Sequence, residues 1–376
     1  MIKQDFENSM EIHSRLPKYV QVKSQLESQI TGGAYQEDEI IPSESELMKT
    51  FGVSRFTIRQ AIKELVRDGL LRTEQGKGTF VCQNSRSKTA GNKIALLSMS
   101  VNTYIFPEIA NGILSLIKDS DLQLILAQTE YSHEQEKQEL LKLMNQNIAG
   151  LIVEQTLSAK PNPNLELFSQ LKKMGIPIVQ IDSKNDALDS PYVILDDELG
   201  GYLAGQYLSS LGHRKAAVVC NMNHQPAVLR MEGFLRAMKE VGVKIPEYWI
   251  KGFEYYGETG IDFGYRLTKE LLALPDQPTA IFFFNDEQAL EGCRAIWDSG
   301  LRVPEDISVV GFDDSELANF SRIQLTTLKH PQMDLGKMAA SILLDVIEEG
   351  KSTPVNPEHR VVIKPELITR DSCRRL

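Results

Sequence analysis

The sequence has 376 residues, of which 42% are hydrophobic and 24% charged, a composition typical of a globular protein with more than one hydrophobic core. The net charge of -10 excludes a protein whose whole surface binds nucleic acid, because such surfaces are basic, so any contact with DNA has to be local. Residues 1–15 contain no apolar secretion signal, no run approaches the ~20 apolar residues of a membrane span, and the four cysteines follow no disulfide or metal-binding spacing, which predicts a cytoplasmic protein.

The chain begins with an N-terminal tail, residues 1–16, after which the pattern predicts two helices. Apolar residues from Pro17 to Ile30 recur at helical spacing, and two glycines then provide a stop. Ser43 and Glu46 are three residues apart, as in a capping box, and predict the start of a second helix. The residues expected to face inward from this helix are Leu47, Met48 and Phe51.

A third helix is predicted after the tight turn Gly52–Ser54, with Ser54 as its cap. The residues at the spacing of an inward face are Ile58, Ala61, Ile62, Leu65 and Val66. The outer face carries Phe56, Arg59, Gln60, Lys63 and Arg67. Two helices joined by a short glycine-containing turn, with a basic outer face on the second, are typical of a helix-turn-helix that enters a major groove.

Two strand-like runs, residues 70–74 and 79–81, flank the sequence Gln75–Gly78 and predict a hairpin whose glycines can approach a phosphate backbone. Between Lys49 and Lys93, basic residues outnumber acidic ones by roughly three to one, which gives the acidic chain a local basic stripe. A helical bundle with a solvated charged face is the alternative. The order of the elements favours a winged helix-turn-helix over residues 17–82.

This segment resembles the DNA-binding domain of the GntR family in PSESEL, FGVSRFTIRQAIKELVRDGLL and QGKGTFV. The resemblance implies that Arg55, Thr57 and Arg59 read bases and phosphates, that Glu44 makes a contact from the second helix, and that Gln75, Gly76 and Lys77 make the wing contacts. An arginine can donate two hydrogen bonds to one guanine, which suits such a role. Phe56 either contacts a thymine methyl group or packs on the wing.

Residues 83–92 are small and polar and predict a linker, and residues 93–376 alternate apolar runs with amphipathic helical stretches. The runs predicted as strands are 94–99, 122–127, 150–153, 176–182, 216–220, 280–284 and 307–310. Strands this apolar indicate parallel sheets covered by helices on both faces. The predicted fold is an α+β winged helix-turn-helix followed by an α/β domain with two doubly wound lobes and a cleft between them.

Residues 93–376 resemble the effector domain of the LacI family, which is similar to periplasmic sugar-binding proteins. The motifs are YIFPEIANGI, GLIVEQT, LDDELGGYLAGQYLSSLGHRK, RMEGF, FFFNDEQAL, VPEDISVVGFDD and LTTLKHP. A GntR-type head on such a domain is similar to the arabinose repressors of Gram-positive bacteria. That resemblance implies a homodimer on operator double-stranded DNA and L-arabinose as the effector, whose binding shifts the two lobes and lowers operator affinity.

Several polar residues are candidates for the effector site. Asn285 and Asp286 follow one predicted strand and Asp313 follows another, at the carboxyl ends where open α/β sheets bind ligands. Arg230 lies in the RMEGF motif and would add a guanidinium group. The family correspondence adds Tyr104, Phe106, Glu154, His224, Tyr255 and His330. For Phe106 and Tyr255 a place in the core is the alternative, and for His224 it is a structural hydrogen bond.

Other function classes lack support in the sequence. The SxxK matches at Ser115 and Ser169 occur without the motifs that accompany them in enzymes, and there is no Walker loop, HExxH or GxSxG motif. We therefore predict no enzyme activity, no catalytic residues, no cofactor, no metal site and no membrane partner. One alternative is the same architecture with another sugar or a purine as effector. The other is a sugar-binding protein or enzyme whose head is an interaction module.

Overall fold

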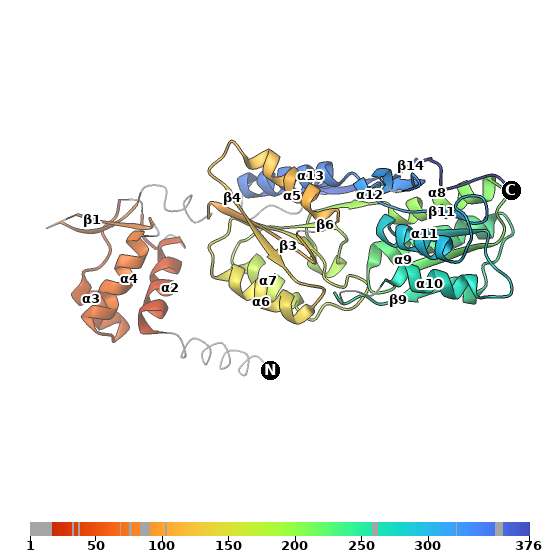
Figure 1. The fold of residues 1–376 in the computed structure, drawn as a ribbon. Coiled ribbons are helices and arrows are strands. Elements are labelled where there is room, and N and C mark those ends of the chain that lie inside the picture. Colours follow the sequence, from red (N-terminus) through yellow and green to blue (C-terminus); the bar gives the residue numbers. More distant parts are fainter. Residues whose placement is uncertain are drawn as a thin grey trace. The chain divides into compact units, whose positions relative to one another are not determined.

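A computed structural model describes residues 17–31, 34–36, 38–67, 69–74, 77–82, 91–101, 104–257, 262–320, 322–349 and 356–376. The predicted tail and most of the predicted linker lie outside these residues. The chain divides into two units, Met1–Gly91 and Asn92–Leu376, and each is described by itself (Figure 1). Within the described residues, no helix is long and apolar enough to span a bilayer.

The first unit contains the three predicted helices and the predicted hairpin. They are α2 (Lys18–Thr31), α3 (Glu44–Phe51), α4 (Arg55–Arg67), β1 (Leu71–Glu74) and β2 (Gly78–Val81), with the two strands antiparallel. Ile58, Ala61 and Leu65 are buried where α4 faces the core. Val66 was expected to face inward but is exposed, because it lies about 100° around the helix from Leu65 and so leaves the buried face.

The sequence signals at the helix ends operate as predicted. Glu46 N–H donates to Ser43 Oγ at 3.4 Å, while Ser43 N–H donates to Glu46 Oε2 at 2.8 Å, which completes the capping box. Gly52 then has a left-handed φ of 61°, which ends α3. Thr57 N–H donates to Ser54 Oγ at 3.2 Å, at the start of α4. These contacts fix how α4 leaves the turn.

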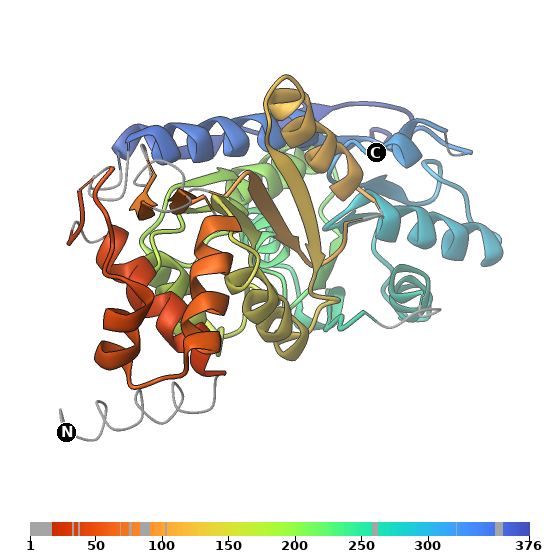
Figure 2. The same cartoon turned by 90° about the vertical axis from the view of Figure 1, so that its left-hand side faces the viewer.

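The second unit has two lobes. Lobe 1 is built on a parallel six-stranded sheet with the order β13-β7-β6-β5-β3-β4. Its strands are β3 (Lys93–Ser98), β4 (Gln123–Gln128), β5 (Gly150–Glu154), β6 (Ile178–Asp182), β7 (Tyr192–Leu195) and β13 (Arg360–Ile363). One face packs on α5 (Phe106–Ile117) and α13 (Gln332–Glu349), and the other packs on α6 (His133–Met144) and α7 (Leu165–Lys173) (Figures 1 and 2).

Lobe 2 contains a parallel four-stranded sheet with the order β11-β10-β8-β9. Its strands are β8 (Ala216–Asn221), β9 (Ile250–Phe253), β10 (Ala280–Phe283) and β11 (Ser308–Val310), and its helices are α8 (Asp197–Ser210), α9 (Gln225–Glu240), α10 (Phe263–Leu272), α11 (Asp286–Asp298) and α12 (Glu316–Phe320). A small antiparallel sheet of β12 (Thr327–Lys329) and β14 (Glu366–Ile368) joins it, and short 3-10 helices lie at 186–188, 247–249 and 357–359. The predicted α/β architecture with two lobes is confirmed.

The chain crosses between the lobes three times. The crossings are Leu195 to Asp197, Lys329 to Gln332 and Ile363 to Glu366. They lie side by side, since Asp196 N–H donates to Ile363 O at 2.8 Å and Lys329 pairs with Glu366 in the small sheet. In each sheet the strand order reverses beside the central strands, β3 and β5 in lobe 1 and β8 and β10 in lobe 2. Such reversals open a crevice at the carboxyl ends of the strands.

Helices α8 and α9 cross at unusually short range. A Cβ atom added to Gly201 would lie 1.7 Å from the carbonyl oxygen of Arg230, and one added to Gly233 would lie 1.9 Å from that of Glu198. Only glycine permits this approach, because any other residue would overlap the backbone of the facing helix. The contact fixes the backbone of Arg230 at the edge of the crevice.

Candidate functional site

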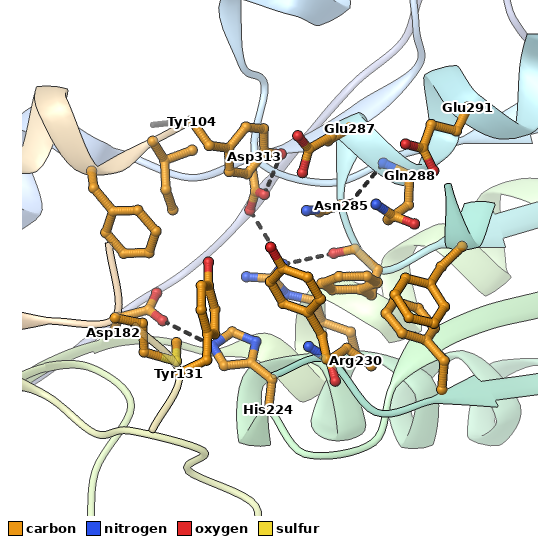
Figure 3. Close-up of a pocket in the computed structure, with 18 of the residues that line it drawn as sticks. Tyr104, Tyr131, Asp182, His224, Arg230, Asn285, Glu287, Gln288, Glu291 and Asp313 are labelled. Atoms are coloured by element: carbon orange, nitrogen blue, oxygen red, sulfur yellow. Dashed lines mark hydrogen bonds and ion pairs between the residues drawn. The ribbon is translucent and has the colours of Figure 1, made fainter. Parts of the chain in front are cut away.

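A cavity of about 380 Å³ lies between the lobes, at the carboxyl ends of both sheets (Figure 3). Lobe 1 contributes Met99, Tyr104, Ile105, Phe106, Tyr131, Glu154 and Asp182. Lobe 2 contributes Asn221, His224, Arg230, Phe253, Tyr255, Asp262, Phe263, Phe284, Asn285, Glu287, Gln288, Glu291 and Asp313. Its size falls within the range of about 300–1,000 Å³ that is usual for small-molecule sites.

The structure brings together most of the residues proposed from the sequence. Those that line the cavity are Tyr104, Phe106, Glu154, His224, Arg230, Tyr255, Asn285 and Asp313. Asp286 and His330 are buried and are not among the lining residues of the described chain. Their contacts, given below, place them behind the cavity wall.

Arg230 projects from α9 and is the buried cation of the cavity wall. Its Nε donates to Asp197 Oδ1 at 2.7 Å, and its Nη1 donates to Phe284 O at 2.7 Å and to Asp313 Oδ1 at 3.2 Å. The guanidinium carbon lies 3.6 Å from the centre of the Phe312 ring. Burial raises the pKa of Asp197 to about 6, because the effect of burial is larger than the opposing effect of the Arg230 charge. The guanidinium group therefore has mainly a structural role. Its Nη2 has no hydrogen bond within the described residues.

Tyr104 links the two lobes across the cavity. Its hydroxyl donates to Asp313 Oδ2 at 2.6 Å and accepts a bond from Asp286 N–H at 3.1 Å. Burial and the two nearby carboxylates raise the pKa of Tyr104 well above its usual value, so the hydroxyl keeps its proton. Asp313 thus accepts one hydrogen bond from each lobe and still has lone pairs for a ligand.

Asp286 and His330 support this arrangement from behind. The Asp286 carboxylate accepts bonds from Thr327 Oγ1 at 2.6 Å and from Ser315 N–H at 2.8 Å, which braces the loop that carries Asp313. Burial and the Asp313 charge raise the pKa of Asp286 to about 7. Both proposed site residues therefore position groups of the cavity rather than face it: Asp286 through this loop, and His330 through a bond to lobe 1.

A compact polar cluster forms where Asp182 of lobe 1 meets His224 of lobe 2 and His330 of one crossing segment. Asp182 Oδ1 lies 3.0 Å from His330 Nε2, and its other oxygen lies 3.5 Å from His224 Nε2. Although burial acts in the opposite direction, the two imidazoles hold the pKa of Asp182 well below its usual range. One ligand atom each from Glu154, Asp182 and His224 lie within 4.8 Å of one another, which among the described residues is close enough to hold a metal ion.

Glu154 is the least satisfied member of the cluster. Its Oε2 accepts bonds from Ser98 Oγ and from Met99 N–H, but its buried Oε1 has no hydrogen-bond partner among the described residues. Burial, with the Asp182 charge, raises the pKa of Glu154 to about 8, so the group is largely protonated at neutral pH. An unpartnered buried carboxyl oxygen is costly, and a polar ligand in the cavity would satisfy it.

Sequence reasoning missed several lining residues. Asp182 is the last residue of a predicted strand, and Asn221 directly follows another, so the strand-end rule that identified Asn285 and Asp313 would have found both. No comparable signal marks Tyr131 in a loop of lobe 1. The residues from the first two turns of α11, Glu287, Gln288 and Glu291, were missed as well.

The first unit presents the proposed DNA-contact residues on α3, α4 and the wing. Arg55 and Arg59 are exposed, and their Nε atoms lie 2.8 Å and 3.2 Å from the two carboxylate oxygens of Glu44. Phe56 is 78% exposed, so it does not pack on the wing. Glu44 thus bridges two arginines that lie one helical turn apart on α4.

The remaining proposed contacts lie at the start of α4 and on the wing. Thr57 shares a hydrogen bond of 2.8 Å with the Ser54 hydroxyl. Lys77 is exposed, and its ammonium group lies 3.1 Å from Glu74 at the end of β1. Gln75 and Gly76 lie outside the described residues.

Comparison with known proteins assigns the chain to a family. Residues 18–81 match the bacterial regulatory proteins of the gntR family, and residues 206–373 match a periplasmic binding protein-like domain. The arabinose metabolism transcriptional repressor of Geobacillus stearothermophilus is 35% identical over 364 residues, which cover 96% of this chain and 99% of that protein. The chain belongs to the arabinose metabolism transcriptional repressor family.

Other regulators are also similar to most of this chain. The ribose operon repressor of Escherichia coli strain K12 is 31% identical over 279 residues, which cover 74% of this chain and 81% of that protein. The structure of a LacI family regulator from Enterococcus faecium with bound ribose is 27% identical, with a TM-score of 0.64, and the match covers 76% of this chain and 99% of that one. The prediction of a DNA-binding transcriptional repressor with a sugar-responsive domain is confirmed at the level of the family.

Proposed function

We propose that this chain is a cytoplasmic, homodimeric repressor whose affinity for operator DNA falls when L-arabinose binds between the lobes. The observation that carries the proposal is the cavity, in which hydrogen-bonding groups of both lobes converge beside aromatic rings. The family relative named for arabinose metabolism supports L-arabinose as the effector. The four cysteines are free thiols, which fits the reducing cytoplasm.

The cavity offers the chemistry that a small polyol needs. Asp313, Asp182 and the Arg230 guanidinium can each exchange hydrogen bonds with sugar hydroxyls, and Glu154 has an oxygen without a partner. Aromatic faces such as that of Tyr255 can cover the apolar C–H side of the ring. A wrong epimer would leave one of these buried groups unpaired, at a cost of about 1–3 kcal/mol, which is the basis of selectivity.

Titration calorimetry of the full chain against L-arabinose, D-ribose, other pentoses, hexoses and purines tests the effector. Heat of binding with L-arabinose, and release of the protein from its operator by the same sugar, are the expected results. Glu154→Gln changes the proton-bearing group and should weaken binding about tenfold or more, whereas Glu166→Gln, on the exposed surface of α7, should leave it unchanged. Absence of heat with L-arabinose would remove it as the effector.

D-ribose is the second candidate effector. The ribose-bound relative and the ribose operon repressor both share this domain. Since ribose and arabinose differ in the orientation of hydroxyl groups, the calorimetric panel separates them directly. Binding of ribose alone would keep the repressor mechanism and change only its signal.

The α4 arginines and the wing would bind operator DNA. We expect Arg59→Ala to weaken specific binding by about 1–3 kcal/mol and to relax base preference, because it removes a base-reading side chain. Lys77→Ala should weaken binding to all sequences alike and reduce its salt dependence, because an ammonium on the wing contacts phosphate. Gel-shift titrations with operator and scrambled DNA at two salt concentrations distinguish the two roles, and equal losses on both DNAs for Arg59→Ala would contradict base reading.

Exposed apolar residues on lobe 1 support the homodimer. Leu114 and Leu116 on α5, Leu126 on the edge strand β4, and Met333 and Met338 on α13 are all exposed. Helices α5 and α13 pack against each other, so these residues come from neighbouring elements. Light scattering should give twice the mass of the chain, and the mass of one chain for a Leu116→Asp, Met338→Asp variant. A wild-type monomer would refute the dimer.

A further inference from the structure

The cavity has a second polar end beyond the groups assigned above to L-arabinose. Glu287, Gln288 and Glu291 all come from the first two turns of α11 and line the cavity. Figure 3 shows them on the opposite side of the cavity from Asp182 and His224. We call Glu287, Gln288 and Glu291 the α11 end.

The α11 end is held in place by the start of α10. The backbone N–H of Gly264 donates to Gln288 Oε1 at 2.7 Å and to Glu291 Oε2 at 3.0 Å. The bond from Gly264 N–H to Gln288 Oε1 fixes the Gln288 amide, whose nitrogen has no hydrogen-bond partner in the described structure. Glu287 is exposed, and no hydrogen bond or ion pair joins its carboxylate to another described residue. The α11 end therefore offers one free donor group and one free carboxylate on a rigid support.

An aromatic wall connects the two ends of the cavity. Phe253 and Phe263 stack with their ring centres 4.3 Å apart and an interplanar angle of 13°. Tyr255 meets Phe263 edge-on at 6.3 Å and meets Tyr131 of lobe 1 edge-on at 4.6 Å. The apolar C–H face of a sugar packs well on such rings. These ring contacts run from Tyr131 of lobe 1 to Phe263, which directly precedes the glycine bonded to Gln288 and Glu291.

The cavity is larger than one pentose. A five-carbon sugar has the bulk of about five or six water molecules at about 30 Å³ each, so it fills less than half of the 380 Å³ cavity. We propose that the α11 end is a second sugar subsite, and that the cavity accepts a disaccharide with one pentose unit at the Asp182 end and the other against the α11 end. This inference rests on the proposed sugar-binding function of the same cavity.

The charge of the α11 end favours a neutral partner. Its carboxyl groups repel an anion. Burial, together with Asp262, raises the pKa of Glu291 to about 7, and burial also raises the pKa of Glu287. Because these carboxyl groups are partly protonated near neutral pH, they can both donate hydrogen bonds to hydroxyl groups and accept bonds from them. They therefore suit a neutral polyol better than a cation, which needs a fully charged carboxylate.

Calorimetry with a disaccharide of two L-arabinose units, beside the monosaccharide, tests the inference on the full chain. We expect the disaccharide to bind at least tenfold more tightly. Glu287→Ala should remove most of that gain and leave the monosaccharide affinity within twofold, since Glu287 has no structural bond to lose. Glu305→Ala, in an exposed loop of lobe 2 away from the cavity, is the matched control and should change neither affinity.

The outcomes separate the inference from the function on which it rests. Binding of the monosaccharide without the disaccharide would overturn the second subsite and keep the proposed function. Equal losses of both affinities in Glu287→Ala would overturn it as well, because the α11 end would then contact the first sugar unit. Heat with neither sugar would overturn the proposed function itself.

Discussion

Replacement of Arg230 by methionine tests how the buried cation holds the cavity together. The change keeps most of the side-chain bulk but removes the donors to Asp197, Phe284 and Asp313. Removal of one partner from a buried ion pair costs about 3–5 kcal/mol, because a charge is left uncompensated. Asp313 keeps the Tyr104 hydroxyl, whereas Asp197 has no other side-chain bond in the described structure. Most of the loss should therefore arise at Asp197.

Urea unfolding followed by tryptophan fluorescence measures this loss where it occurs, since both tryptophans, Trp249 and Trp297, belong to the core of lobe 2. Adding Asp197→Asn to Arg230→Met should recover about half of the lost free energy. Arg236→Met on the same helix is the control. Its ion pairs are half-exposed, so it should cost less than about 1 kcal/mol. Equal losses for the two single variants would refute the argument from burial.

Two further predictions concern the cavity. Tyr104→Phe removes a hydrogen bond to a charged group, worth about 1.5–3 kcal/mol, and should weaken L-arabinose binding between about tenfold and 150-fold in calorimetry; tighter binding would mean that the hydroxyl competes with the sugar for Asp313. Stability should fall as the pH rises from 6 to 8.5, because Glu154 and Asp286 have folded-state pKa values of about 8 and 7 and unfolding releases their protons. Each group contributes at most about 1.4 kcal/mol per pH unit. Glu154→Gln should lower the slope of the fluorescence-monitored profile between pH 7 and 8.5 without abolishing it, because Asp286 and Glu291 still titrate; a wild-type profile that is already flat would contradict the assignment.

The main strands were predictable because strands buried on both faces appear as continuous apolar runs. The missed strands are β7, β9, β12, β13 and β14, which are short and not buried along their whole length, whereas the equally short β10 and β11 are fully buried and were predicted. β13 and β14 also alternate or expose their side chains, because β13 is an edge strand and β14 belongs to the small sheet. No apolar run marks such strands, and their place depends on the neighbours that the chain provides elsewhere.

Some cavity residues were likewise predictable from the sequence pattern, whereas others depend on how the helices pack. Side chains directly after a strand were predictable, as Asn285 and Asp313 were, because topology places every strand end at the crevice. Asp286 was expected in the cavity, but its carboxylate turns to Thr327 and Ser315, and Glu287, one residue further along the helix, lines the cavity instead. The rotation of α11 about its axis decides between them, and that rotation is set by its packing, chiefly on α10 and also on β10 and β11.

The three adjacent crossings between the lobes limit how a ligand can act. Three adjacent crossings along one edge resist twisting and sliding of the lobes, so we expect the lobes to move mainly by opening and closing about that edge. A ligand in the cavity would then change only the angle between the lobes. Two ligands that close the lobes to the same angle would have the same effect on DNA binding. Asp196 and Pro331 lie in two of the crossings. Substitutions there would change how DNA affinity responds to the ligand without altering a contact to the ligand.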